Sequence, residues 1–201
     1  MHPNPLFRHD DTAALDRHAG RIGFGSVFLT TPEGPRVAHT PLLIADDRLR
    51  FHLARGNALT RHLDGARALA CVTGPDAYVS ARWYDAPDQV STWNYIALEY
   101  EGPVRRLGED ALVALLEDLT AREEGRIVSG GTPWTMDKLS APAMRGLLRG
   151  IVGFEMTVEA RRETVKLARH KPAGDLARLA AGVEAEGHAE MARLMREGLA
   201  A

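Results

Sequence analysis

Three short strand patterns joined by two tight turns constrain the fold more than any other feature of the sequence. Residues 24–31 are rich in β-branched and aromatic side chains, and residues 36–44 return as a second such segment after a Pro-Glu-Gly-Pro turn. A pair of aspartates then leads into residues 48–53, where apolar and polar side chains alternate strictly. Such alternation is typical of a half-buried strand. Because parallel strands would need long crossover connections, we expect an antiparallel meander.

The rest of the chain adds further short strands and a few helices. Helices are predicted over residues 10–20, 108–124 and 139–149, with a short one capped by Asn57 and one or two amphipathic helices within 174–200. Strands are predicted over residues 67–73, 77–84, 92–104 and 151–158. Many short strands with few helices between them indicate a mainly β fold with α decoration, an antiparallel barrel or sandwich.

The domain organisation predicted from this pattern is simple. We expect residues 1–172 to form one domain with inserted helices. Residues 173–201 would form a C-terminal helical extension, with a partner subunit rather than its own barrel as a candidate docking surface. A chain of 201 residues is long enough to bury a sizeable core.

Charge and composition exclude several classes of protein. The 25 Lys and Arg residues against 27 Asp and Glu residues give a net charge of -2, so bulk attraction to nucleic acid or to an anionic membrane is not expected. The single cysteine excludes an intrachain disulfide framework and a multi-cysteine zinc site. No signal-peptide pattern and no apolar run of membrane-spanning length is present. We therefore expect a cytoplasmic protein without a membrane segment, and no metal site is predicted.

The segment from His52 to Asn57 is the first candidate site, because a strand is expected to end there and a helix to begin. Backbone N–H groups at a helix N-terminus attract anions. Arg55 supplies a planar fork suited to phosphate, and Gly56 would let a ligand approach the backbone. An ordinary strand-to-helix turn explains the same residues equally well.

The second candidate is a dense aromatic stretch between residues 74 and 95. It contains two of the three Trp and three of the four Tyr residues, interleaved with Ser, Thr, Asn and Arg. Such a surface could form a wall for a flat heteroaromatic ring with hydrogen-bonding edges. The alternative is aromatic packing in a sheet or in a dimer core.

Several of these segments resemble the PaiB family of FMN-binding negative transcriptional regulators. The segment His52-Leu-Ala-Arg-Gly-Asn57 resembles that family's H-x-A-R-x-N motif, and residues 74–84 resemble its G-P-x-A-Y-x-S-x-x-W-Y motif. Thr92-Trp-Asn-Tyr95 matches the T-W-N-Y signature, residues 37–41 resemble the A-T-H-x-P strand, and 151–155 resemble the I-V-G-F-E strand. The two aromatic motifs in this order and at this spacing are specific.

The resemblance implies an antiparallel split β-barrel of the pyridoxamine-phosphate-oxidase (FMN-binding) type, with FMN at the interface of a homodimer. It agrees with the antiparallel arrangement predicted from the strand patterns. The flavin ring would supply any redox chemistry, so an FMN-dependent oxidoreductase remains open. The implied cofactor-binding residues are His52, Ala54, Arg55, Gly56, Asn57, Tyr78, Ser80, Trp83, Thr92, Trp93, Asn94, Tyr95 and Lys166.

One departure from the family pattern leaves alternatives open. The family's last motif, K-L-S-Q-N, reads Lys-Leu-Ala-Arg-His at residues 166–170, so contacts made by this strand would differ. One alternative is a regulator that acts through protein or DNA contacts without flavin, although no recognition helix supports direct DNA binding. Another is a haem-binding split barrel with His39 or His170 as axial ligand.

Overall fold

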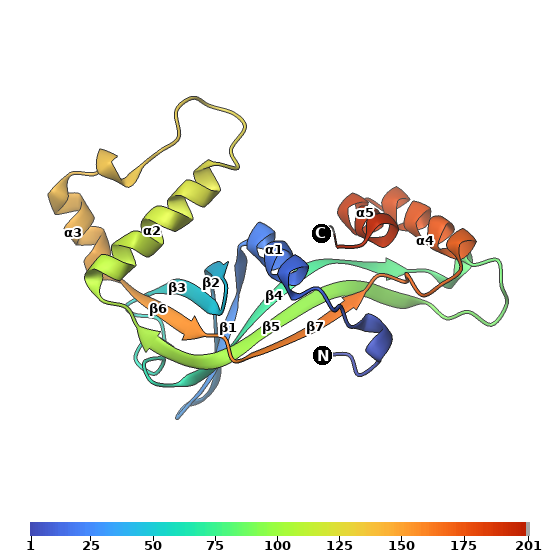
Figure 1. Ribbon diagram of the computed structural model, residues 1–201, viewed down its shortest axis with the longest axis horizontal. Coiled ribbons are helices and arrows are strands. Elements are labelled where there is room, and N and C mark those ends of the chain that lie inside the picture. Colours follow the sequence, from blue (N-terminus) through green and yellow to red (C-terminus); the bar gives the residue numbers. More distant parts are fainter. Residues whose placement is uncertain (200–201) are drawn as a thin grey trace. The chain divides into compact units, whose positions relative to one another are not determined.

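The computed structural model describes residues 1–199, and its strands form one mainly antiparallel sheet (Figure 1). Their order is β4-β1-β2-β3-β6-β5-β7, and β4 pairs additionally with β5. Residues 200 and 201, at the end of the predicted extension, lie outside the described residues. The strands are β1 (Phe24–Thr31), β2 (Gly34–Ala45), β3 (Arg48–Ala54), β4 (Arg67–Val79), β5 (Thr92–Arg106), β6 (Ile151–Thr157) and β7 (Ala160–Lys166).

The helices occupy most of the predicted positions. They are α1 (Thr12–Ile22), α2 (Glu109–Glu124), α3 (Ala141–Gly150), α4 (Ala173–Ala185) and α5 (Ala189–Glu197), with short 3-10 helices η1 (Pro5–Phe7), η2 (Ala81–Trp83) and η3 (Met136–Lys138). The first helix runs through Gly20, which was expected to end it, and stops before Gly23, where φ is +67°. Among residues 1–199, no helix combines the length and the apolar character needed to span a bilayer.

The predicted meander is confirmed. Strand β1 pairs antiparallel with β2 from Phe24 opposite Pro41 to Thr31 opposite Gly34, and β2 pairs in turn with β3. In β3, residues 49, 51 and 53 are buried while their neighbours are not, as the alternation predicted. The turn into β3 places Asp46 at φ +51°, a conformation that short polar residues such as Asp adopt more readily than most.

The chain divides into two compact units that do not follow the predicted boundary at residue 172. The first unit consists of residues 1–22, 72–99 and 161 onward, and the second of residues 23–71 and 100–160. Strands β4 and β5 each contribute residues to both units.

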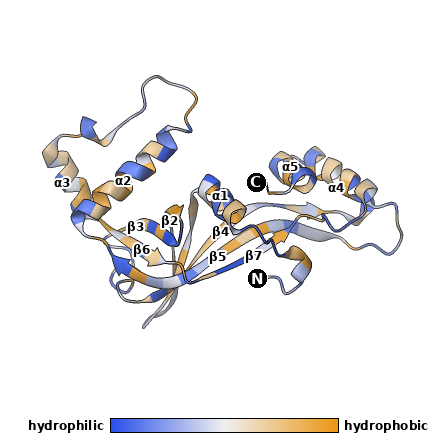
Figure 2. Ribbon diagram, viewed as in Figure 1, coloured by the Kyte–Doolittle hydropathy of each residue, from blue (hydrophilic) through white to orange (hydrophobic). Residues whose placement is uncertain are grey.

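In the first unit, α4 and α5 carry their apolar positions inward (Figure 2). Leu179 and Val183 of α4 and Met191 of α5 are buried. A Cβ atom at Gly182 would lie 2.4 Å from the ring of Trp83 in η2, so α4 approaches η2 at a glycine. The helices of the predicted extension therefore pack against their own chain, and their docking on a partner subunit stays a prediction.

In the second unit, α2 packs against strands β2, β3 and β6, and α3 packs against β6. Leu115 and Leu119 of α2 form part of its predicted apolar stripe and pack in one core with Leu107 and Leu43. The guanidinium of Arg122 donates to the carbonyl oxygens of Leu42 (2.6 Å) and Gly23 (3.2 Å), which ties the end of α2 to the start of the meander.

Two predicted elements are wrong in detail. No helix follows Asn57, because residues 57–65 form a succession of turns. The strands expected at 67–73 and 77–84 are one strand, β4, which continues through Gly74 and Pro75 and ends at Val79.

Candidate functional site

The predicted anion-binding segment lies at the end of β3 and in the turns that follow. His52 is half-buried, and its backbone oxygen accepts a hydrogen bond from the hydroxyl of Thr40 (2.6 Å). Its Nδ1 atom is buried and has no hydrogen-bond partner among residues 1–199. Burial lowers the pKa of the imidazole, so His52 is neutral at pH 7.

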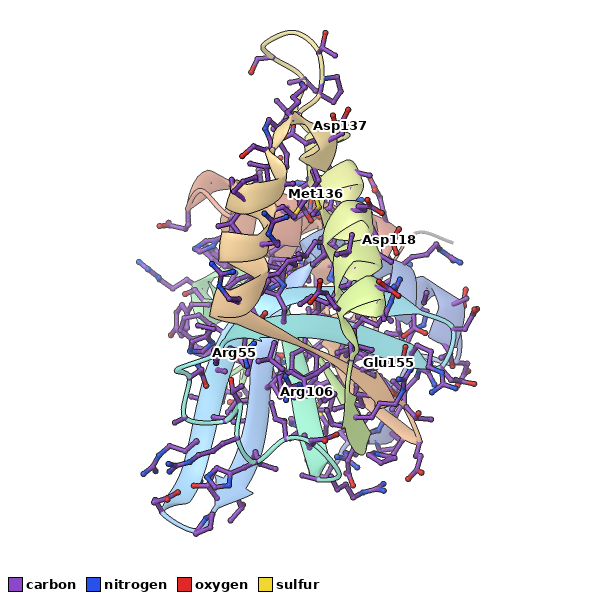
Figure 3. All side chains as sticks on the ribbon, turned by 90° about the vertical axis from the view of Figure 1, so that its left-hand side faces the viewer. Arg55, Arg106, Asp118, Met136, Asp137 and Glu155 are labelled. Carbon is purple, nitrogen blue, oxygen red and sulfur yellow. The ribbon has the colours of Figure 1, made fainter. Side chains whose placement is uncertain are left out.

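The guanidinium of Arg55 is held by the end of α3. Its Nε donates to the carbonyl of Arg149 (2.7 Å), and a terminal nitrogen donates to the carbonyl of Ile151 (3.3 Å). Arg55 and Arg106 both line a small hollow of about 90 Å³, and Figure 3 shows them on the same side of the second unit. Because Arg55 is exposed and presents five N–H groups, it keeps donors free for a ligand.

Turns replace the expected helix N-terminus beside Arg55. The Asn57 side chain accepts from the Leu59 N–H (3.0 Å), and the Thr60 hydroxyl donates to the carbonyl of Ala54 (2.9 Å). A Cβ at Gly56 would meet no atom within 4 Å, so the space beside that backbone is open. An anion here would meet turn backbone and Arg55 rather than a helix dipole.

The aromatic wall belongs to the first unit. The rings of Tyr78 and Trp93 pack edge to face with centroids 6.0 Å apart, and the two residues are 49% and 52% exposed. Trp93 and Tyr95 face away from the buried side of β5, whereas Asn94 faces into it, as strand alternation predicted. The structure therefore presents two large aromatic rings to the outside of this sheet.

Asn94 is a buried amide without a partner. It is 1% exposed, and neither its Oδ1 nor its Nδ2 makes a hydrogen bond within the described chain. Leaving a buried polar group unsatisfied costs about 1–3 kcal/mol. Strand alternation predicted its face, but nothing in the sequence indicated that its amide would be unpaired.

Ser80 and Trp83 have local structural contacts. The buried Ser80 hydroxyl accepts from the Arg82 N–H (3.3 Å) and so caps η2. Trp83 lies against Gly182 of α4. These contacts fix η2 locally and hold it against α4.

Lys166 is a partly desolvated cation at the end of β7. Its ammonium donates to the hydroxyl of Thr92 (2.5 Å) and lies 5.5 Å from the centroid of the Phe7 ring. Burial lowers its pKa, and within residues 1–199 it makes no ion pair. Thr92 directly precedes Trp93 in β5, and strand alternation puts its side chain on the face of Asn94, opposite the Trp93 ring. Phe7 was missed by sequence reasoning, because its partner lies far along the chain.

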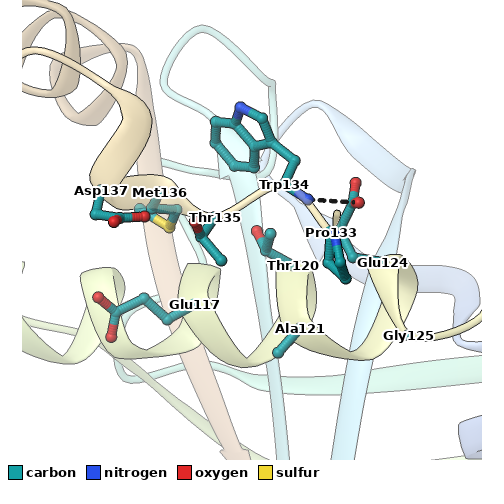
Figure 4. A pocket seen from close by; sticks show the side chains of 10 residues that line it. All are labelled: Glu117, Thr120, Ala121, Glu124, Gly125, Pro133, Trp134, Thr135, Met136 and Asp137. Carbon is teal, nitrogen blue, oxygen red and sulfur yellow. Dashed lines mark hydrogen bonds between the residues drawn. The ribbon is translucent and has the colours of Figure 1, made fainter. Parts of the chain in front are cut away.

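A hollow over α2 was also missed. It has a volume of about 440 Å³ and is lined by α2 and by residues 133–137, with the Trp134 indole over it (Figure 4). An adjoining hollow of about 300 Å³ shares Trp134 and is lined by His52 and Pro41. The sequence signal was weak, since Trp134 stands alone in a glycine-rich loop.

Comparison with known proteins finds a family and a fold. A model of the family "Putative FMN-binding domain" matches residues 1–160. The Bacillus subtilis (strain 168) protein "Protease synthase and sporulation protein PAI 2" is 32% identical over 184 residues, which cover 88% of this chain and 87% of that protein.

Two solved structures show the same fold. The FAD and heme binding protein of Mycobacterium smegmatis superposes with a TM-score of 0.62 at 22% identity, over 79% of this chain and 72% of its own. The flavocytochrome Anf3 of Azotobacter vinelandii also has a TM-score of 0.62, at 14% identity, over 83% of this chain and 72% of its own. The predicted mainly antiparallel split-barrel fold with helices is confirmed.

Proposed function

Because the chain belongs to the FMN-binding-domain family whose model covers residues 1–160, we propose that it binds FMN at the interface of a homodimer. The observation that carries the proposal is the exposed pair of rings formed by Tyr78 and Trp93. Exposed aromatic rings suit the flat face of a flavin. When bound, the flavin would supply redox chemistry, and the protein would orient it.

The proposed contacts divide between the two ends of the cofactor. Tyr78, Trp93 and Tyr95 contact the ring system. Lys166, which donates to the Thr92 hydroxyl, is a further contact that the family resemblance implies. Ser80, which caps η2, Trp83 of η2 and Asn94 of β5 complete the contacts proposed for this end. The terminal phosphate contacts the open turn formed by Ala54, Arg55, Gly56 and Asn57, with His52 close by.

An uncovered apolar sheet face supports the dimer. Phe24, Phe28 and Val37 are large hydrophobic residues exposed on β1 and β2. Phe28 lies opposite Val37 on one side and opposite Leu69 of β4 on the other, so apolar side chains run in a row across three strands. Contiguous exposed apolar surface of this kind marks an interaction site, and a second copy would cover it.

A regulatory role is the second candidate. It is supported by the 32% identical relative, whose name refers to protease synthesis and sporulation. In this case flavin would be a bound signal rather than a redox catalyst, and protein or DNA contacts would carry the effect. A cytoplasmic location would suit either role. Haem is a further alternative, since the two similar structures are described as a heme binding protein and a flavocytochrome.

Binding of FMN and riboflavin to the Arg55→Ala variant tests the site. Charge-assisted hydrogen bonds contribute about 1.5–3 kcal/mol, so FMN binding should weaken about ten- to a hundredfold. Riboflavin lacks the phosphate, so its affinity should hardly change. Flavin fluorescence quenching measures both affinities, and the visible spectrum of freshly purified protein distinguishes flavin from haem.

The matched control is Arg61→Ala, which removes an exposed arginine from the same run of turns. It should leave both affinities unchanged. Equal weakening of FMN and riboflavin in Arg55→Ala would assign Arg55 to holding the end of α3, and an unchanged FMN affinity would move the phosphate to Lys166 or Arg82.

A further inference from the structure

Two adjoining hollows lie beside α2, and of the residues that line them only His52 takes part in the FMN proposal. They share Thr120, Glu124 and Trp134. Met136, in η3, is buried beneath the larger hollow, and Ala121 of α2 adds a further apolar side chain. Figure 4 shows Trp134 among the side chains that line the larger hollow, on the chain segment that faces α2.

The charged side chains that line the larger hollow are all acidic. They are Glu117 and Glu124 of α2 and Asp137 of η3. The smaller hollow adds Glu123, and neither lining includes a lysine or an arginine. The ammonium of Lys138, adjacent in sequence to Asp137, donates to the carbonyl of Pro133 (3.0 Å).

Two of these four carboxylates have a partner in an ion pair or a hydrogen bond. Glu123 forms ion pairs with Arg122 and Arg126, and Glu124 accepts a hydrogen bond from the backbone N–H of Trp134 (2.8 Å). Within residues 1–199, the side-chain carboxylates of Glu117 and Asp137 have neither an ion pair nor a hydrogen bond. Figure 4 shows these two carboxylates at the same end of the hollow.

The one titratable base at the hollow does not offset this charge. His52 lines the smaller hollow, and burial lowers the pKa of its imidazole, which leaves it neutral at pH 7. Its Nδ1 is buried and has no hydrogen-bond partner among the described residues.

We propose that this hollow binds an organic ammonium ion. A cation over the face of an indole is attracted by the ring quadrupole, and Trp is the strongest of the aromatic side chains in this respect. Glu117 and Asp137 supply the opposite charge, and the apolar lining accommodates alkyl groups. A volume of about 440 Å³ suits a small ligand. The charge complementarity excludes anions, so this site is distinct in chemistry from the proposed phosphate contact at Arg55.

Titration calorimetry of the full chain with choline and with its neutral isostere 3,3-dimethylbutan-1-ol tests the proposal at low ionic strength. Choline should bind about tenfold tighter than the alcohol or better, and added salt should reduce the difference by screening. The double variant Glu117→Gln, Asp137→Asn should weaken choline about tenfold and leave the alcohol unchanged. The matched control Asp110→Asn, on the same helix but outside the lining, should change neither.

The proposal is overturned if choline and the alcohol bind equally, if choline gives no binding heat, or if the double variant keeps the choline affinity of the parent. The Trp134→Leu variant provides a second test that leaves every carboxylate in place. It should weaken choline more than the alcohol, and equal weakening of both would show only an apolar surface. Repeating the titration with saturating FMN separates this site from the proposed flavin site, because choline should still bind.

Discussion

His18 of α1 carries the clearest electrostatic consequence of burial at the scale of a single residue. It is 3% exposed, and its Nε2 has no partner among residues 1–199. Burial first, and then the charge of Arg21, lowers its pKa from 6.5 to about 4. Between these values the unfolded chain binds more protons than the folded one, so the free energy of unfolding falls as pH drops from 6.5 to 4. The full effect is about 3 kcal/mol.

Urea unfolding of the parent and of His18→Gln at pH 7 and pH 4.5 measures this contribution. The variant should lose less stability between the two pH values than the parent does. His188→Gln removes an exposed histidine and serves as the control, with a pH dependence like the parent's. Equal losses in parent and His18→Gln would assign the acid sensitivity to other groups, of which His52 and His170 also have pKa values lowered by burial.

At the scale of elements, the segment that departs from the family pattern explains how the C-terminal helices are held. Arg169 donates to the carbonyl oxygens of Met195 (3.2 Å) and Arg196 (2.7 Å), at the end of α5. A cation at a helix C-terminus also interacts favourably with the helix dipole. The variant Arg169→Gln, which restores the family's residue, should therefore lower the free energy of unfolding by about 1 kcal/mol.

Thermal unfolding, with amide hydrogen exchange in α5 as the local measurement, checks this expectation. Exchange should accelerate in α5 and remain unchanged in α2. Arg17→Gln, which breaks an exposed pair with Asp11, is the matched control and should have little effect. If α5 exchanges at the parent's rate in Arg169→Gln, the two carbonyl contacts do not hold the helix.

The strands and helices with a clear hydrophobic period could be predicted from the sequence. Segments whose backbone is set by local hydrogen bonds or by close contact between strands were predicted wrongly. The meander and the stripe of α2 followed from spacing alone. The helix after Asn57 fails because Asn57 and Thr60 bond to nearby backbone groups and so favour turns. The two strands predicted at 67–73 and 77–84 join through Gly74, where an added Cβ would lie 2.9 Å from that of Ile96, so the glycine permits close contact between strands.

At the scale of the whole molecule, the single motifs of the candidate site could be predicted from the sequence, but their arrangement in space could not. Trp93 and Asn94 lie on opposite faces of β5, as neighbouring residues of a strand must. The contact between Lys166 and Phe7 and the hollow under Trp134 bring together segments that are distant in sequence. No local pattern encodes such contacts, and the residues of the predicted site fall in both compact units.

The exposed apolar row on β1, β2 and β4 predicts that the protein forms a dimer. The parent should be a dimer of twice 22.0 kDa in light scattering at micromolar concentration, since an obligate interface buries more than about 2,000 Å². Phe28→Glu places a charge between Val37 and Leu69 in the middle of the apolar row, so it should yield a folded monomer that binds FMN weakly.

Val128→Glu, at a fully exposed apolar residue of the α2–α3 loop, is the matched control and should leave the dimer intact. A parent that scatters as a 22.0 kDa species would remove the dimer, and with it the interface location proposed for FMN. A dimeric Phe28→Glu protein would instead place the interface on another face.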